Sequence, residues 1–165
     1  MSASSASAAA IVFEPEFLAG LTTIFEEKIV FNQLLGLKAT SIAPQQVVAR
    51  IDMRPELVGH YAYNRIHGGV ISAGLDAMGG LAVMAAIGAK HMSEPPEQRL
   101  HRFAKLGTID LRIDYMRAAT PRQAITARAE CYHVTRSVAF VRAWAMDEDE
   151  TRPVASASGA FTFER

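Results

Sequence analysis

A short run of polar residues and glycines is the part of the sequence best suited to chemistry. Asn64-Arg65-Ile66-His67-Gly68-Gly69 precedes a long apolar stretch, so Gly68 and Gly69 fall where a helix is expected to begin. The first N–H groups of a helix have no partner within it and carry partial positive charge, so they could polarise a carbonyl oxygen. Two glycines also let another molecule approach these groups closely. A tight turn needed only for packing would explain the same pair.

Asp76 is the second candidate, because it is the only charged residue between Val70 and Ala89. A lone carboxylate in an apolar helix costs free energy unless it is paired or used, which makes it a candidate general base or nucleophile. Gly79 and Gly80, one turn further on, leave space beside it for a ligand or another chain. The alternative is a structural Asp that hydrogen-bonds to a neighbouring strand.

The spacing of these two candidates constrains how they could cooperate. Asp76 lies seven or eight residues beyond the glycine pair, which corresponds to roughly 10–12 Å along a helix. One small carbonyl group cannot contact both the helix N-terminus and Asp76 of the same chain. If both act on one bond, a second subunit must contribute one of them. The chemistry therefore predicts a homodimer or homotetramer with the site at the subunit interface.

Other reaction types find little support in the sequence. The five histidines form no His-x-x-x-His pair, which favours neither a metal site nor another cofactor. No serine lies in a nucleophile-elbow pattern. Cys131, the single cysteine, lies on the apolar side of an expected strand, which is typical of core packing and excludes an internal disulfide.

Composition describes one globular domain. The chain has 165 residues, 17 basic and 17 acidic side chains and 50% hydrophobic residues, which argues against a nucleic-acid partner. We interpret residues 1–12 as a disordered tail and 13–165 as a single domain. Residues 70–89 are long enough to span a bilayer, but Asp76 and four glycines favour a buried core helix and no membrane partner. With no signal-peptide pattern, we expect a cytoplasmic protein.

Hydrophobic periodicity predicts an α+β fold. Helical spacing over 14–31 predicts an N-terminal helix, and 92–106 is interpreted as a long loop. A period of two predicts the strands; these are expected over 37–42, 47–53, 108–115, 125–134, 138–146 and 154–163. An antiparallel sheet wrapped around one buried helix accounts for this order. The helix is apolar all round, so we expect a neighbouring subunit to cover its second flank.

Three features together resemble a known family. They are His67-Gly68-Gly69, then Asp76 nine residues after the histidine, and then the segment 107–117, which reads Gly-Thr-Ile-Asp-Leu-Arg-Ile-Asp-Tyr-Met-Arg. This combination resembles the hotdog-fold acyl-CoA thioesterases of the PaaI-like group, over about residues 34–163. The resemblance implies an antiparallel sheet around one long central helix, in a dimer or tetramer, and hydrolysis of an acyl-CoA to a free acid and CoA.

The resemblance also implies roles for individual residues. Asp76 is expected to be the catalytic carboxylate, as general base on water or as direct nucleophile, and these two options stay open. The N–H of Gly68 is expected to polarise the thioester carbonyl, while His67 and Gly69 shape the turn that holds the substrate. Thr108 falls where family members place a Ser or Thr that orients the water or the carboxylate.

Two expectations concern the edges of the site. The Thr135-Arg136-Ser137 stretch matches a strand turn where a basic residue often approaches CoA phosphates, although Arg136 could equally be a solvated charge. Many members carry an Asn six residues before the His, where this chain has Tyr61, so Asn64 is the candidate for that polar role.

Small residues along the apolar helix favour an aliphatic, medium-chain acyl group. The alternatives are a non-catalytic acyl-CoA-binding module, which would not need Asp76, and a dehydratase, which would use a His within a different loop pattern.

Overall fold

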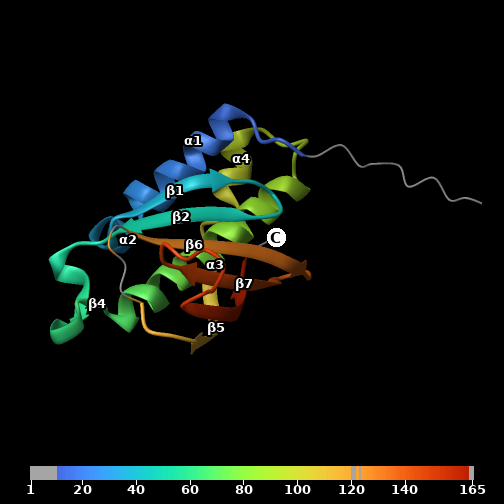
Figure 1. Ribbon diagram of the computed structural model, residues 1–165. Helices are drawn as coiled ribbons and strands as arrows, with labels where there is room; N and C mark the ends of the chain where they lie inside the picture. Colours follow the sequence, from blue (N-terminus) through green and yellow to red (C-terminus); the bar gives the residue numbers. More distant parts are fainter. Residues whose placement is uncertain (1–10, 120–121, 123, 164–165) are drawn as a thin grey trace, which may run out of the picture.

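The computed structural model describes residues 11–119, 122 and 124–163 of the chain. The expected tail, 1–12, therefore lies outside the described residues except for Ile11 and Val12. Most of the segment 120–123, between the strands expected over 108–115 and 125–134, also lies outside them; its sequence, Thr-Pro-Arg-Gln, predicts a turn. The first ten and last two residues are drawn as a thin grey trace in Figure 1.

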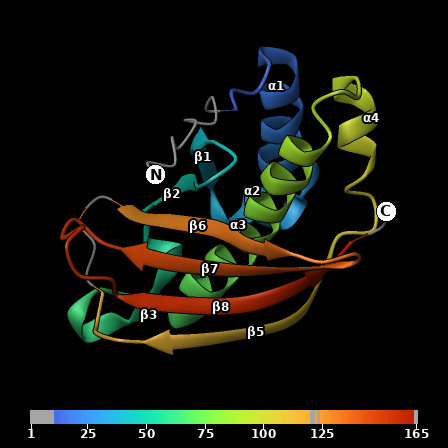
Figure 2. The same cartoon turned by 90° about the vertical axis from the view of Figure 1, so that its right-hand side faces the viewer.

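One six-stranded antiparallel sheet forms the body of the protein (Figure 2). Its strands are β1 (Leu37–Ile42), β2 (Val47–Asp52), β5 (Gly107–Tyr115), β6 (Ala124–Val134), β7 (Val138–Met146) and β8 (Ala155–Thr162). They lie in the order β1-β2-β6-β7-β8-β5, and every neighbouring pair is antiparallel. All six strands fall where the two-residue period predicts them. Strand β5 lies at one end of the sheet, and no other strand in the described part of the chain pairs with its outer edge.

The long helix α3 (Gly68–Lys90) packs across one face of this sheet and contacts β2, β5, β6, β7 and β8. Thirteen of its 23 residues are buried, among them Leu75, Met78 and Leu81, which belong to a single hydrophobic core. It is long and apolar enough to cross a membrane, yet 67% of its most apolar window is buried inside the protein. The helix is therefore the core helix that the sequence predicts.

The second flank of α3 is covered partly by the chain itself (Figures 1 and 2). Helices α1 (Pro15–Thr23), α2 (Val30–Leu35) and α4 (Pro96–His101) lie beside its C-terminal half, and the ring of Phe17 packs directly against Gly88. The fully buried Arg99 joins α4 to α1, because its guanidinium binds Glu14 at 2.6 Å and stacks on Phe17. This cover comes from the same chain, where the sequence predicted a neighbouring subunit.

The structure corrects three local predictions. The helix expected over 14–31 is divided, because a π-helical turn, η1 (Ile24–Lys28), separates α1 from α2. The loop expected over 92–106 contains α4, which begins at Pro96, a residue well suited to a first helical turn. Ahead of α3, where no strand was predicted, lies a small hairpin; its strands are β3 (Val58–His60) and β4 (Arg65–Ile66).

Candidate active site

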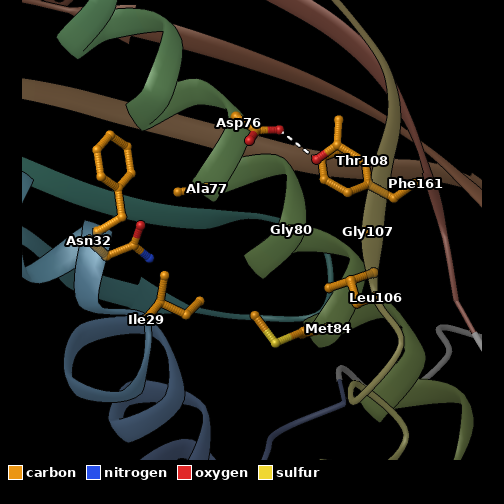
Figure 3. A pocket seen from close by; sticks show the side chains of 11 residues that line it. Ile29, Asn32, Asp76, Ala77, Gly80, Met84, Leu106, Gly107, Thr108 and Phe161 are labelled. Atoms are coloured by element: carbon orange, nitrogen blue, oxygen red, sulfur yellow. Dashed lines mark hydrogen bonds between the residues drawn. The ribbon is translucent and has the colours of Figure 1, made fainter.

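Asp76 lies in the first half of α3, half-buried, with its carboxylate directed toward strand β5 (Figure 3). The Thr108 hydroxyl donates a 2.7 Å hydrogen bond to Asp76 Oδ1. A hydrogen bond to a charged oxygen is stronger than one between neutral groups, so it fixes the orientation of the carboxylate. The second carboxylate oxygen is left available to act on a substrate. The structure thus joins the two residues that the sequence placed 32 positions apart.

Thr108 faces Asp76 because strand β5 contains a β-bulge. Thr108 pairs with Phe161 and Asp110 pairs with Ala160, which leaves Ile109 without a partner. Directly paired residues point to the same face of a sheet, and Phe161 points into the core. The extra residue therefore turns Thr108 to the helix side, as bulges near functional sites often do. An unbroken alternation would have placed it on the solvent face with Asp110.

Asp76 and Thr108 both line a cavity, called here the Asp76 cavity, whose remaining walls are mostly apolar (Figure 3). Helix α3 contributes Asp76, Ala77, Gly80 and Met84, and the neighbouring strands and loops contribute Leu106, Gly107, Thr108 and Phe161. The N-terminal segment closes it with Ile29, Phe31 and Asn32. One carboxylate at the edge of an apolar cavity is suited to a substrate with a reactive polar group and an aliphatic body.

The N-terminus of α3 forms a second arrangement. His67 is the N-cap, and its Nδ1 accepts a 2.8 Å hydrogen bond from the Gly69 N–H. The Gly68 N–H makes no hydrogen bond with the described part of the chain. It is thus the free donor of the first turn, where a helix stabilises negative charge. His67 therefore shapes this turn, as predicted, whereas the role of the Gly68 N–H as oxyanion donor stays a prediction.

Close packing explains why positions 68 and 69 are both glycine. A Cβ atom on Gly69 would lie 2.8 Å from His67 Nδ1, so any side chain there would disrupt the cap. A Cβ on Gly68 would meet the Tyr115 ring at 3.3 Å, and the Tyr115 hydroxyl donates a 2.8 Å hydrogen bond to the Gly68 carbonyl. Neither glycine has a positive φ. Tyr115 therefore attaches the start of α3 to the end of β5, and sequence reasoning missed this role.

The remaining predicted residues lie elsewhere in the chain. Asn64 is exposed at the tip of the β3–β4 hairpin with φ 48° and ψ 39°, the left-handed conformation that Asn tolerates. Arg136 is exposed in the β6–β7 turn and lines a different cavity with Lys90, about 21 Å along α3 from Asp76. Ser137 accepts a backbone hydrogen bond from Phe163 in the same turn. Within one chain, none of the three lines the Asp76 cavity.

Asn32 is a cavity residue that the sequence did not suggest. It is 2% exposed, and its amide donates a 2.9 Å hydrogen bond to the Phe25 carbonyl. A polar residue within an amphipathic helical segment is normally assigned to the solvent face, so its burial gave no local signal.

Metal and thiol chemistry have no structural basis among the described residues. They contain no group of three or more His, Cys, Asp or Glu side chains able to hold a metal ion. Burial raises the pKa of the Cys131 thiol, which lowers its thiolate fraction and fits its position beside the core.

Comparison with known proteins agrees with this geometry. The thioesterase superfamily model matches residues 63–154, more than half of the chain. A medium/long-chain acyl-CoA thioesterase of Salmonella typhimurium, YigI, is 29% identical over 84% of this chain and 88% of its own length. Its Escherichia coli counterpart is 28% identical over the same shares. A crystal structure from Shewanella oneidensis, described as related to the thioesterase superfamily, is 28% identical, with a TM-score of 0.82 over 92% of this chain and 100% of that one.

An antiparallel sheet packed on one long central helix, in a chain whose curated relatives are acyl-CoA thioesterases, identifies a hotdog-fold thioester hydrolase. The chain belongs to the thioesterase superfamily.

Proposed function

We propose that this enzyme hydrolyses medium-chain acyl-CoA thioesters to a free fatty acid and CoA. The observation that carries the proposal is the Asp76 carboxylate, held by Thr108 at the edge of a cavity with mainly apolar walls. The two YigI proteins, named as medium/long-chain acyl-CoA thioesterases, support this substrate class.

The reaction requires few groups. In the general-base form, Asp76 accepts a proton from water while the water oxygen attacks the thioester carbon. The oxyanion forms beside the N–H of a Gly68, collapse breaks the C–S bond, and the leaving thiolate takes up the proton. A thiolate leaves readily because a thiol pKa is about 8.5. A positioned base contributes about 10²–10⁴-fold.

In the nucleophile form, Asp76 attacks the thioester carbon directly, and water then hydrolyses the resulting anhydride. A single turnover in ¹⁸O-labelled water separates the two forms. The general-base route always places ¹⁸O in the first fatty acid released. In the nucleophile route, water that attacks the Asp76 carboxyl carbon of the anhydride leaves the first acid unlabelled and places ¹⁸O in Asp76, so this result identifies the nucleophile form.

The oxyanion donor comes, in this proposal, from a second copy of the chain. Gly68 and Asp76 of one chain lie eight residues apart on α3, about 12 Å. Two hydrogen bonds attach them to β5 at separate points: Thr108 binds Asp76 and Tyr115 binds Gly68. If two β5 edges pair antiparallel, the Thr108 end of each strand lies beside the Tyr115 end of the other. This pairing would bring Gly68 of the partner subunit toward Asp76.

The surface of β5 supports such a pairing. The strand is nine residues long and has an unpaired edge, and Ile109 and the neighbouring Met116 are each 59% exposed. Exposed apolar edge strands favour pairing with another chain. A two-fold axis at residue 111 would place Arg112 opposite Asp110 of the partner subunit, which gives a favourable charge pair. We therefore expect the smallest active species to be a homodimer, within a dimer or tetramer.

The same proposal assigns residues that would bind the polar part of CoA. Arg136 and Ser137 of a neighbouring copy of the chain would contact its phosphates, because within one chain their β6–β7 turn lies toward the end of α3 that carries Met84 and Lys90. Asn64 would contact the substrate from the β3–β4 hairpin. Acyl-CoA is a soluble cytoplasmic metabolite class, in keeping with the cytoplasmic location expected for this chain.

The deciding experiment measures free-thiol release from a series of acyl-CoAs, with Asp76→Asn as the matched variant. Asn has nearly the shape of Asp but cannot accept the proton or attack, so turnover should fall by at least 100-fold with little change in thermal stability. Light scattering under assay conditions should show at least a dimer. Acyl-CoA binding without thiol release by the wild-type protein would favour the binding module instead.

A further inference from the structure

The Asp76 cavity follows one face of α3. Its lining residues on that helix are Asp76, Ala77, Gly80 and Met84, which recur at the three- to four-residue spacing of one helical face. Asp76 and Met84 are eight residues apart, so the face extends about 12 Å from the carboxylate. Met84 is 4% exposed and closes the far end (Figure 3).

Gly80 keeps the middle of this face open. A Cβ atom at Gly80 would lie 3.9 Å from Leu106 and 3.9 Å from Phe161, which is ordinary contact distance. The neighbouring Gly79 is different, because its Cβ would lie 2.7 Å from the Phe161 ring. Gly79 is therefore glycine because the core leaves no room. Position 80 has room for a side chain, and the lack of a side chain there leaves space beside the Asp76 carboxylate.

The opposite wall of the Asp76 cavity comes from the N-terminal segment. Ile29, Phe31 and Asn32 lie outside residues 63–154, the part that matches the superfamily model. The hydrogen bond from Asn32 to the Phe25 carbonyl ties this wall to the π-helical turn η1 (Ile24–Lys28). A short π-helical segment inserted between α-helices often marks a functional position. The N-terminal segment thus supplies a second wall opposite the α3 face, and the two walls together form a groove that starts at Asp76.

We propose that Gly80 and Met84 set the length of the acyl chain that the enzyme accepts. The inference rests on the proposed thioesterase function and adds its specificity. An extended chain advances about 1.2 Å per bond, by analogy with the 3.3–3.6 Å of three backbone bonds. The face between Asp76 and Met84 therefore holds about ten bonds, which corresponds to an acyl group of about ten carbons. Gly80 lies near the middle, about five bonds from the carboxylate.

The test compares kcat/KM for hexanoyl-, octanoyl-, decanoyl-, dodecanoyl- and palmitoyl-CoA. In the wild-type enzyme the value should rise about fourfold per buried methylene up to about ten carbons and then stop rising. Gly80→Val should end the rise near hexanoyl-CoA, so the decanoyl-to-hexanoyl ratio should fall by at least tenfold. Met84→Ala should extend the rise to dodecanoyl-CoA or beyond. Ala86→Val, which adds comparable bulk on the opposite face of α3, should keep the wild-type profile.

The outcomes separate the two proposals. If the wild-type enzyme releases thiol from no acyl-CoA, the proposed function itself fails. If it is active but Gly80→Val leaves its chain-length profile unchanged, or if Ala86→Val shifts it equally, the function stands and the inference is wrong. Should Gly80→Val not fold by circular dichroism, Gly80→Ala decides. The methyl group that this substitution adds fits without a clash, and alanine favours the helix, so this variant should fold. It should lower the decanoyl-to-hexanoyl ratio of kcat/KM about fourfold, and an unchanged ratio overturns the inference.

Discussion

Replacing Thr108 by Val tests the link between the edge strand and the carboxylate. Valine keeps the β-branched shape and suits a strand, but it cannot donate the 2.7 Å hydrogen bond to Asp76. Thr108 lies on the exposed side of the cavity in a single chain, so the fold should tolerate the change within about 0.5 kcal/mol. The expected effect is on turnover rather than on stability.

The magnitude follows from the hydrogen bond. A bond to a charged group contributes about 1.5–3 kcal/mol, and about 1.4 kcal/mol changes a rate tenfold. If Thr108 is solvated in the working enzyme, its hydrogen bond should contribute near the lower end of that energy range, and kcat should fall about tenfold. If a second subunit covers it, as the proposed β5 pairing requires, the loss should approach about 100-fold. The size of the effect therefore also reports on the surroundings of the site.

The assay is steady-state thiol release at saturating and limiting acyl-CoA. We expect the loss in kcat with little change in KM, because Thr108 orients the carboxylate and does not hold the acyl chain. Thr108→Ser should recover most of the activity, since it restores the hydroxyl. In an Asp76→Asn background the same substitution should cost almost nothing further. Wild-type kcat in Thr108→Val, or equal losses in the Val and Ser variants, would refute the argument.

Three further predictions concern the supporting structure. The Arg117 guanidinium holds the pKa of Asp147 below its ordinary value of 3.8, so this pair stabilises the fold above that pH and loses its effect as the pH falls through the lowered pKa. Melting temperature should drop below about pH 4, and less steeply in Asp147→Asn; equal slopes would contradict this. Glu14→Gln should lower the melting temperature by leaving the buried Arg99 without its carboxylate, and adding Arg99→Met should restore part of it. A double variant no more stable than the single one would count against this account. His67→Ala should cost about 1 kcal/mol in urea unfolding through loss of the N-cap, and an unchanged midpoint would show that the cap contributes nothing.

Hydrophobic periodicity was sufficient to predict the strands of the sheet and the buried core helix. The strand expected over 138–146 matches β7 residue for residue, and the apolar run containing Asp76 is the core helix. These features are visible in sequence because burial of one face imposes a period on the side chains. His67 as a turn-forming residue could also be foreseen, since an N-cap depends on neighbours two or three positions away.

Features fixed by distant contacts could not be foreseen. The apolar/polar alternation of residue types continues through Ile109 in the sequence, so only the hydrogen-bond register with β8 reveals the bulge that turns Thr108 toward the helix. The end of the N-terminal helix depends on Glu26, whose carboxylate accepts hydrogen bonds from the Ala39 N–H and from Lys38, both at 2.8 Å. Such contacts join residues more than ten positions apart and leave no local pattern.

Strand β5 explains why site and assembly are difficult to separate in this protein. The strand is bonded to the middle of α3 at Thr108 and to the start of that helix at Tyr115, so it holds both proposed catalytic elements, while its outer edge pairs with no other described strand. In one chain these elements lie too far apart for a single thioester. A two-fold pairing of that edge would complete two identical sites at once, because each strand contributes both of its ends. Pairing with a second copy of the chain would therefore cover the β5 edge and complete the proposed site.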